Sequence, residues 1–123
     1  MADDQKKIIV VDDNEASRVA CKNILKSRYA VFPVPSAEKL FELLKRITAD
    51  LILLDVEMPE MSGYEAARIL KTNDAWKNIP LIFLSGRSDA AGEKEGLDLG
   101  ALRFIVKPVD SALLLECMEK YLS

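Results

Sequence analysis

Oxygen-bearing side chains and one lysine stand at the ends of four short apolar runs of the sequence. Asp12 and Asp13 follow the first run, and Asp55, Ser85 and Lys107 close three later ones. Carboxylates brought together repel one another and need a compensating positive charge. A hard divalent cation such as Mg²⁺ prefers oxygen ligands and would supply that charge. These residue types together indicate a metal-assisted site for phosphoryl chemistry.

Phosphoryl transfer needs mainly positioning and charge stabilisation. With a cation and Lys107 neutralising an incoming phosphate, one carboxylate could attack phosphorus and form an acyl phosphate. The hydroxyl of Ser85 could then donate a hydrogen bond to the attached group. Each residue alone also fits a plain turn or helix N-terminus, so the prediction depends on the combination at four run ends.

The elements that must position these residues follow from the apolar pattern. Short runs rich in β-branched residues predict buried strands, and apolar residues at helical spacing predict a helix after each of them. The expected strands are 7–11, 29–34, 51–54, 81–84 and 102–106, and the helices begin after the capping residues Asn14, Ser36 and Ser62, at 88, and after Asp110. Pro33 favours a sheet edge for the second strand because proline lacks the ladder donor.

This alternation predicts an α/β fold, in which a parallel sheet is covered by helices on both faces. Such a doubly wound sheet binds ligands at the carboxyl ends of its strands, which is where the polar residues fall. The second helix should extend to Ile47, and the segment 88–99 should form a weak helix because it contains Gly92 and Gly96. A length of 123 residues predicts one domain, 1–123.

Composition excludes several classes of protein. A net charge of −3, from 17 basic and 20 acidic residues, does not suggest a direct nucleic-acid partner. With no histidine, Ser-His-Asp and Cys-His nucleophiles and the usual zinc sites are excluded. No apolar run could cross a membrane and the start lacks a signal-peptide pattern, so we expect a cytoplasmic protein. Cys21 and Cys117 lie among apolar residues at helical spacing and are expected to be buried thiols.

Four segments carry a resemblance to a known family: VVDDN at 10–14, LLDVEMPEMSG at 53–63, FLSG at 83–86 and FIVKP at 104–108. In order and spacing they resemble the signature segments of receiver domains of two-component response regulators, including the chemotaxis receivers. The resemblance covers roughly residues 7–122. It implies the flavodoxin-like fold, a (βα)5 three-layer sandwich whose five-stranded parallel sheet has the order 2-1-3-4-5.

The resemblance also implies residue roles around a metal. Asp55 would be the phospho-acceptor. Asp13 would bind Mg²⁺, or Mn²⁺, directly, and Asp12 would do so directly or through water. Asp55 itself and the backbone carbonyl of Glu57 would complete the protein ligands.

Further roles concern the phosphoryl group and the switch. By resemblance, Ser85 and Lys107 would contact the phosphoryl group, and Ser85 and Phe104 would form the switch. Phe104 lacks the hydroxyl of the tyrosine that is frequent there, so it would act by packing alone. Lys107 and Pro108 would be joined by a cis peptide bond.

Glu57 and Arg87 occupy the positions two residues after Asp55 and Ser85, which flank the phosphoryl site in the family. Their opposite charges suggest the hypothesis that they form an ion pair over the mouth of the site and affect the access of hydrolytic water. Two solvated side chains with little coupling are the alternative.

The expected partners follow from the same resemblance. A sensor histidine kinase or a phosphotransfer protein would donate the phosphoryl group. A downstream protein would bind the face formed by the fourth helix, fifth strand and fifth helix, and the chain would be a monomer or weak homodimer. It would be a signalling domain rather than an enzyme acting on a separate substrate, catalysing only its own phosphorylation and dephosphorylation.

Three alternatives stay open. One is a phosphorylation-independent interaction module of the same fold. A flavin protein would need a Gly-, Ser- or Thr-rich phosphate loop after the first strand, where this chain has Asp12, Asp13 and Asn14. An aspartate-nucleophile phosphatase would normally carry its nucleophile after the first strand, together with a cap domain for which there is no room.

Overall fold

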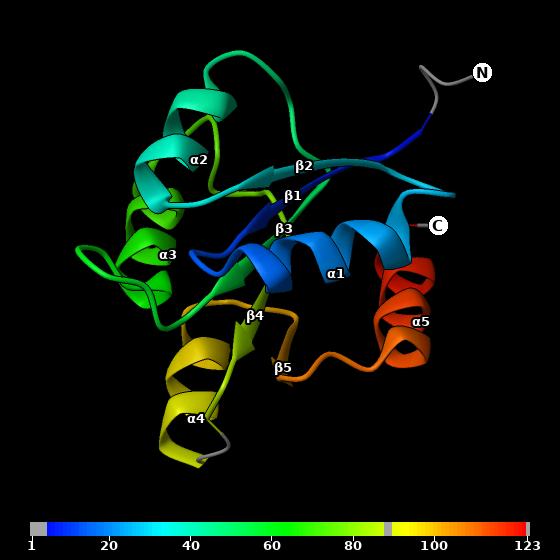
Figure 1. The fold of residues 1–123 in the computed structure, drawn as a ribbon. Coiled ribbons are helices and arrows are strands. Elements are labelled where there is room, and N and C mark those ends of the chain that lie inside the picture. The colour runs from blue at the N-terminus through cyan, green and yellow to red at the C-terminus, as the bar shows by residue number, and fades with distance from the viewer. Residues whose placement is uncertain (1–4, 88–89, 123) are drawn as a thin grey trace.

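Five parallel strands alternate with five helices in a computed structural model, which describes residues 5–87 and 90–122 (Figure 1). In chain order the elements are β1 (Lys7–Val11), α1 (Glu15–Leu25), β2 (Ala30–Val34), α2 (Ala37–Leu44), β3 (Leu51–Asp55), α3 (Gly63–Thr72), β4 (Leu81–Ser85), α4 (Ala90–Asp98), β5 (Arg103–Val106) and α5 (Ser111–Leu122). The expected alternation of strands and helices is therefore confirmed.

The sheet has the strand order β2-β1-β3-β4-β5, which confirms the order implied by the family resemblance. Its register sets the strand ends level: Val11 pairs with Leu54, and Asp55 pairs with Leu84. β2 pairs with β1 alone among the described strands, so Pro33 lies in an edge strand as expected.

Two apolar cores lie on opposite faces of the sheet, because successive strand residues point to opposite sides. Ile8 and Val10 belong to the core that contains Leu25 of α1 and Leu114 of α5. Ile9 and Val11 belong to the other core, with residues of α2 and α3. Figure 1 shows α1 and α5 on one side of the sheet and α2, α3 and α4 on the other. The three-layer arrangement is thus confirmed.

The predicted caps begin four of the helices. The side chains of Asn14 and Ser36 accept hydrogen bonds from the backbone amides three residues later. Ser62 forms a full capping box with Glu65, and Asp110 Oδ1 accepts from two amides of α5. Each side chain satisfies donors that have no partner within the helix.

Two helix bounds differ from expectation. α2 ends at Leu44 rather than Ile47, because the chain tightens there: the amide of Arg46 bonds the carbonyl three residues back, at 2.9 Å. The fourth helix is described from Ala90 to Asp98, and residues 88–89 of the expected segment lie outside the described part.

Gly96 has a packing role that the sequence analysis assigned only to weak helix propensity. It is the buried residue of α4, and a Cβ added to it would lie 2.9 Å from Phe83 and 3.3 Å from Phe104. The missing side chain therefore lets α4 approach β4 and β5 closely.

Cys21 and Cys117 are free and buried, as expected. Burial raises the pKa of the Cys21 thiol to about 11, so it stays protonated at neutral pH. Within residues 5–87 and 90–122, no helix has the length and apolar composition needed to span a bilayer.

Gly63 places the start of α3 directly against the strand end that carries Asp55. Its amide donates to the carbonyl of Val56 at 2.9 Å, and an added Cβ would lie 2.2 Å from the backbone oxygen of Asp55. Relieving this overlap would require the backbone of β3 or α3 to shift, which costs free energy. We therefore expect Gly63→Ala to lower the free energy of unfolding by about 2–3 kcal/mol in urea denaturation.

Gly86→Ala is the matched control, since a Cβ there would meet only the Glu57 side chain at 3.6 Å. We expect this control to change the free energy of unfolding by less than about 0.5 kcal/mol. Equal losses in the two variants would contradict the assigned packing of Gly63.

Candidate functional site

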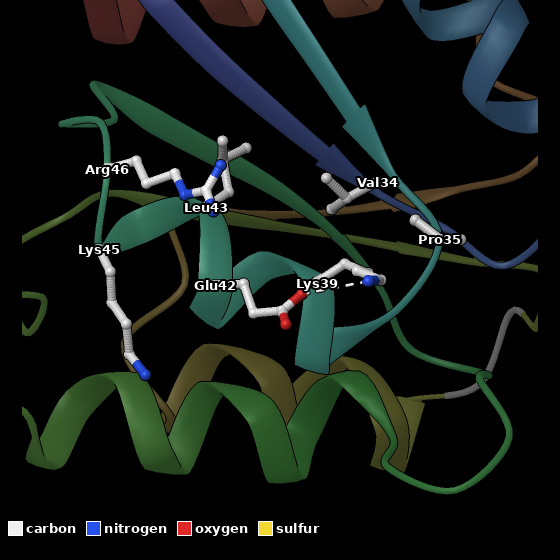
Figure 2. Close-up of a pocket in the computed structure, with 7 residues that line it drawn as sticks. All are labelled: Val34, Pro35, Lys39, Glu42, Leu43, Lys45 and Arg46. Atoms are coloured by element: carbon white, nitrogen blue, oxygen red, sulfur yellow. Dashed lines mark ion pairs between the residues drawn. The ribbon is translucent and has the colours of Figure 1, made fainter.

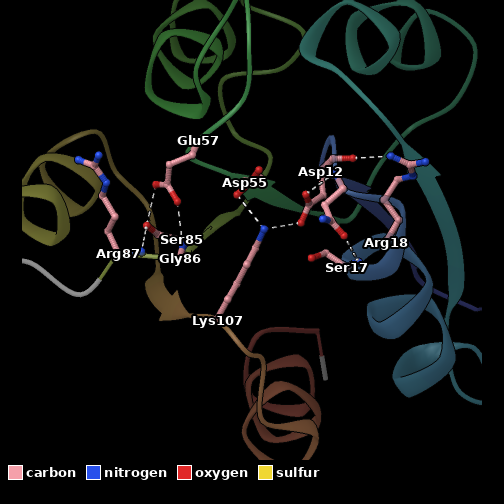
Figure 3. A network of polar contacts seen from close by, with 10 residues as sticks. Asp12, Ser17, Arg18, Asp55, Glu57, Ser85, Gly86, Arg87 and Lys107 are labelled. Atoms are coloured by element: carbon pink, nitrogen blue, oxygen red, sulfur yellow. Dashed lines mark hydrogen bonds and ion pairs between the residues drawn. The ribbon is translucent and has the colours of Figure 1, made fainter.

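The polar residues at the strand ends meet at one edge of the sheet (Figure 3). The amide of Asp12 donates to the carbonyl of Val34 at 3.1 Å, and that of Lys107 donates to the carbonyl of Ser85 at 2.7 Å. These bonds continue the strand ladders by one residue beyond β1 and β5. The site residues are therefore placed by the same register that builds the core.

Lys107 lies between the carboxylates of Asp12 and Asp55. Its Nζ atom is 2.7 Å from Asp12 Oδ2 and 3.0 Å from Asp55 Oδ1. Asp12 is 0% exposed and Asp55 is 1% exposed. Apart from the ammonium group, these two oxygens have no hydrogen-bond partner in the described part of the chain. Two buried negative charges thus share one positive charge.

The position of Asp12 is fixed by the capping residue Asn14 and by Arg18 of α1. Its Oδ1 atom accepts from the amide of Asn14 at 2.9 Å, and its backbone oxygen accepts from Arg18 Nη1 at 2.8 Å. Sequence analysis did not single out Arg18. The available signal was a basic residue one helical turn after the cap Asn14, which places it beside the preceding strand end.

The acidic residues fit a hard divalent cation. Carboxylate oxygens of Asp12, Asp13 and Asp55 all lie within 4.8 Å of one another, and Asp13 is exposed. Oxygen donors of this kind suit Mg²⁺ or Mn²⁺. The two buried oxygens that have only Lys107 as a partner point to the same need for positive charge. Glu57 as a carbonyl ligand stays a prediction.

The pKa values at the site reflect the same charge imbalance. The pKa of Asp55 is raised to about 7: burial raises it most, the hydrogen bond and charge of Lys107 lower it, and the charges of Asp12 and Glu57 add to the rise. Burial alone would lower the pKa of Lys107, but its contacts with Asp12 and Asp55 outweigh burial and raise it. The lysine therefore stays charged, and one cation does not fully stabilise two carboxylates.

Ser85 is buried at the end of β4, and its hydroxyl is already engaged. Its Oγ atom donates to Glu57 Oε2 at 2.7 Å and accepts from the amide of Arg87 at 3.0 Å. The amide of Gly86 donates to Glu57 Oε1 at 2.8 Å (Figure 3). Both oxygens of Glu57 are therefore held by the turn that follows β4.

The expected ion pair between Glu57 and Arg87 is wrong for this conformation. The ion pairs formed between described residues do not include it. Two donors on a short turn hold the Glu57 carboxylate at little entropic cost, whereas the exposed Arg87 side chain would have to be immobilised.

Phe104 lies on β5, half-buried, and lines a hollow of about 470 Å³ together with Glu57, Ser85 and Arg87. The predicted switch residues thus border a common space. The peptide bond between Lys107 and Pro108 is cis, as expected.

Tyr64 connects α3 to α4 across this hollow, a contact that sequence analysis missed. Its hydroxyl donates to the carbonyl of Gly92 at 2.7 Å, and its ring meets the edge of Phe83 with centroids 5.2 Å apart. Arg68 on α3 adds an exposed ion pair with Glu95 at 2.7 Å. An aromatic residue in the first turn of α3 was the only available signal.

A separate groove of about 560 Å³ lies where β2 meets α2 (Figure 2). It is lined by Val34, Pro35, Lys39, Glu42, Leu43, Lys45 and Arg46. Its one carboxylate, Glu42, pairs with Lys39 at 3.2 Å. None of the residues predicted for the phosphoryl site lines it, so the candidate site is the cluster at the strand ends.

Comparison with known proteins shows the family. Residues 8–119 match the response regulator receiver domain family, and the chain belongs to this family. A response regulator receiver protein from Pseudomonas putida is 30% identical, with a TM-score of 0.88 over 94% of this chain and 97% of that one. A signal receiver domain of a histidine kinase from Syntrophus aciditrophicus is 32% identical, with a TM-score of 0.85 over 95% and 89%.

Curated relatives are much longer than this chain. A probable cyclic di-GMP phosphodiesterase of Vibrio cholerae is 38% identical over 110 residues, which are 89% of this chain and 25% of the relative. The chain spans 8–30% of the length of such relatives. Their shared part is the receiver domain, and the activities of the whole relatives belong to those proteins.

The pKa of Asp55 leads to a prediction about stability. Because folding raises this pKa from 3.8 to about 7, ionised Asp55 disfavours the folded state, and stability should fall as pH rises through this range. Asp55→Asn removes the charge. We expect it to raise the free energy of unfolding in metal-free urea denaturation at pH 8 by about 1–2 kcal/mol. The gain should shrink toward pH 4.

Asp13→Asn is the matched control, because Asp13 is exposed on the same acidic cluster. It should change the free energy of unfolding by less than about 0.5 kcal/mol. A destabilised Asp55→Asn protein at pH 8 would show that the ionised carboxylate is well stabilised, contrary to this account.

Proposed function

We propose that this receiver domain accepts a phosphoryl group on Asp55 from a sensor histidine kinase or a phosphotransfer protein, in a Mg²⁺-dependent reaction. The observation that carries the proposal is the buried Asp55 carboxylate, 3.0 Å from the Lys107 ammonium and within the acidic cluster. Receiver domains as a family act as phospho-acceptors in two-component signalling. The assignment to Asp55 rests on its place in this site.

The transfer would form a bond between a carboxylate oxygen of Asp55 and phosphorus while the bond from phosphorus to the donor's nitrogen breaks. The donor histidine leaves with the electron pair of that bond. Lys107 would neutralise charge on the phosphoryl oxygens, and Ser85 would donate a hydrogen bond to one of them. A Mg²⁺ or Mn²⁺ ion held by Asp12, Asp13, Asp55 and the Glu57 carbonyl would add positive charge to the same oxygens.

Only the ionised carboxylate can attack phosphorus. Since burial raises the pKa of Asp55 to about 7, added positive charge at the site would favour the reactive form. The reaction would then be completed by water, which hydrolyses the acyl phosphate. We propose that the chain catalyses only these two reactions on itself.

We further propose that phosphorylation changes a protein-interaction face formed by α4, β5 and α5. Leu97 on α4, Leu102 just before β5 and Val106 on β5 are 44%, 37% and 39% exposed and support this assignment. Movement of Ser85 toward the phosphoryl group would free space for Phe104, which borders the same hollow. A downstream protein would bind this face, and the chain would act as a monomer or weak homodimer.

The domain extent and the location in the cell stay predictions. Residues 1–123 are proposed as one receiver domain, in the cytoplasm, without a direct nucleic-acid or membrane partner.

Phosphorylation itself is tested by intact-mass measurement after incubation with Mg²⁺ and a small-molecule phosphoryl donor. We expect the parent protein to gain one phosphoryl group, because its acceptor is buried beside Lys107. The Asp55→Asn variant should gain none, and a chelator should abolish the gain in the parent.

Absence of any gain in a folded, Mg²⁺-binding parent would contradict the proposal. The chain would then be a phosphorylation-independent interaction module. A gain that persists in Asp55→Asn would place the acceptor elsewhere.

The proposed switch is tested by amide hydrogen exchange. Residues 90–106 should exchange at different rates in the phosphorylated and unphosphorylated protein, because Gly96 is the one buried residue among those described in α4 and packs beside Phe104. Residues 30–44, in β2 and α2, serve as the internal reference and should change little. Equal exchange across 90–106 in the two states would contradict the switch.

A further inference from the structure

Glu57 binds two donors at the end of β4, one of which, the Ser85 hydroxyl, is the proposed hydrogen-bond donor to a phosphoryl group on Asp55. Its carboxylate accepts the Ser85 hydroxyl at 2.7 Å and the Gly86 amide at 2.8 Å. Both donors stand at the end of β4, the strand that pairs directly with β3 beside Asp55. The hydroxyl and the amide together form a two-point site for an anion, and a carboxylate of the chain itself fills it.

The Ser85 hydroxyl cannot serve both anions at once. A serine hydroxyl carries a single proton and can donate one hydrogen bond. Here the proton goes to Glu57, while the oxygen accepts the Arg87 amide at 3.0 Å. A hydrogen bond from Ser85 to a phosphoryl oxygen therefore requires the bond to Glu57 to break.

Glu57 is placed to leave this position. Glu57 is exposed, whereas Ser85 is 1% exposed. The Glu57 carboxylate can therefore rotate toward solvent while the Ser85 hydroxyl stays in the site. The charge of Glu57 acts unfavourably on ionised Asp55 and would repel a phosphoryl group there more strongly. Arg87 borders the same hollow and offers a positive charge near the displaced carboxylate.

We propose that Glu57 is a positioning residue that holds Ser85 and Gly86 in the resting protein and competes with the phosphoryl group for both donors. The inference rests on the proposed function of Asp55 as acceptor. Glu57 would therefore oppose activation. Its two hydrogen bonds stabilise the resting state, and phosphorylation must break them. Hydrogen bonds to a charged partner are strong enough to shift such a balance by about tenfold or more.

Beryllium fluoride, an analogue of the phosphoryl group on aspartate, is the probe. Its affinity in the presence of Mg²⁺ is measured by following backbone amide resonances for the parent, Glu57→Gln and Glu60→Gln. The two donors bond different oxygens of Glu57, and glutamine in the same position is neutral and replaces one of these oxygens with an NH₂ group, so one of the two hydrogen bonds is lost. We expect Glu57→Gln to bind the probe about tenfold more tightly.

Glu60→Gln removes the same charge from the same loop, where the described contacts of Glu60 include no side-chain hydrogen bond or ion pair. It should change the probe affinity by less than about twofold. The Mg²⁺ affinity is measured separately in each protein. A gain in probe affinity without a gain in Mg²⁺ affinity would not arise from the metal.

Ser85→Ala separates competition for donors from general electrostatics. Without the Ser85 hydroxyl, Glu57 and the probe no longer compete for that donor. Glu57→Gln should therefore increase the probe affinity much less in the Ser85→Ala background. An equal increase in both backgrounds would overturn the proposal, because it would reflect charge alone.

A last measurement needs no phosphoryl group. The Gly86 amide should exchange with water faster in Glu57→Gln than in the parent, because its acceptor is weakened. Unchanged exchange would show that Glu57 does not hold the turn, and would overturn the proposal.

If the parent takes up phosphate but Glu57→Gln binds the probe with parental affinity, the competition is wrong and the function proposed for Asp55 stands. If no protein takes up either group, the function proposed for Asp55 fails and the competition fails with it.

Discussion

The organisation of this site depends on a buried excess of negative charge. Asp12 and Asp55 are almost inaccessible to water, and one ammonium group, that of Lys107, lies between them. Such an arrangement is stable only if further positive charge can be recruited or if a proton is retained. The raised pKa of Asp55 expresses the second solution, and the exposed carboxylate of Asp13 offers a cation a place beside the buried pair.

That charge arrangement is held by the most deeply buried strands of the sheet. The apolar residues of β1, β3 and β4 are buried on both faces of the sheet, and their register fixes Asp12, Asp55 and Ser85 at one edge. Gly63 brings the first turn of α3 against the carbonyl of Asp55. The core thus resists the relaxation that would otherwise separate the charges or admit water.

Contacts around the site connect it to α4, the least buried helix. Glu57 holds the turn after β4, Tyr64 bonds the carbonyl of Gly92, and Gly96 rests on Phe83. Each contact is local, and together they join the proposed phosphoryl site to a face with exposed Leu97 and Val106. An anion that recruits Ser85 would therefore act on the turn between β4 and α4.

The sequence by itself determined the strands, four helix caps, the buried cysteines and the residue types of the site, because apolar periodicity and capping are local properties of the chain. The strand order and the cis bond at Pro108 came from the resemblance to receiver domains. Only the tertiary structure decided how charges pair. Glu57 and Arg87 looked complementary in sequence, yet Glu57 bonds Ser85 and Gly86. The contacts of Arg18 and Tyr64 and the packing of Gly96 likewise needed the tertiary structure, since distances between side chains on different elements depend on how the helices pack on the sheet.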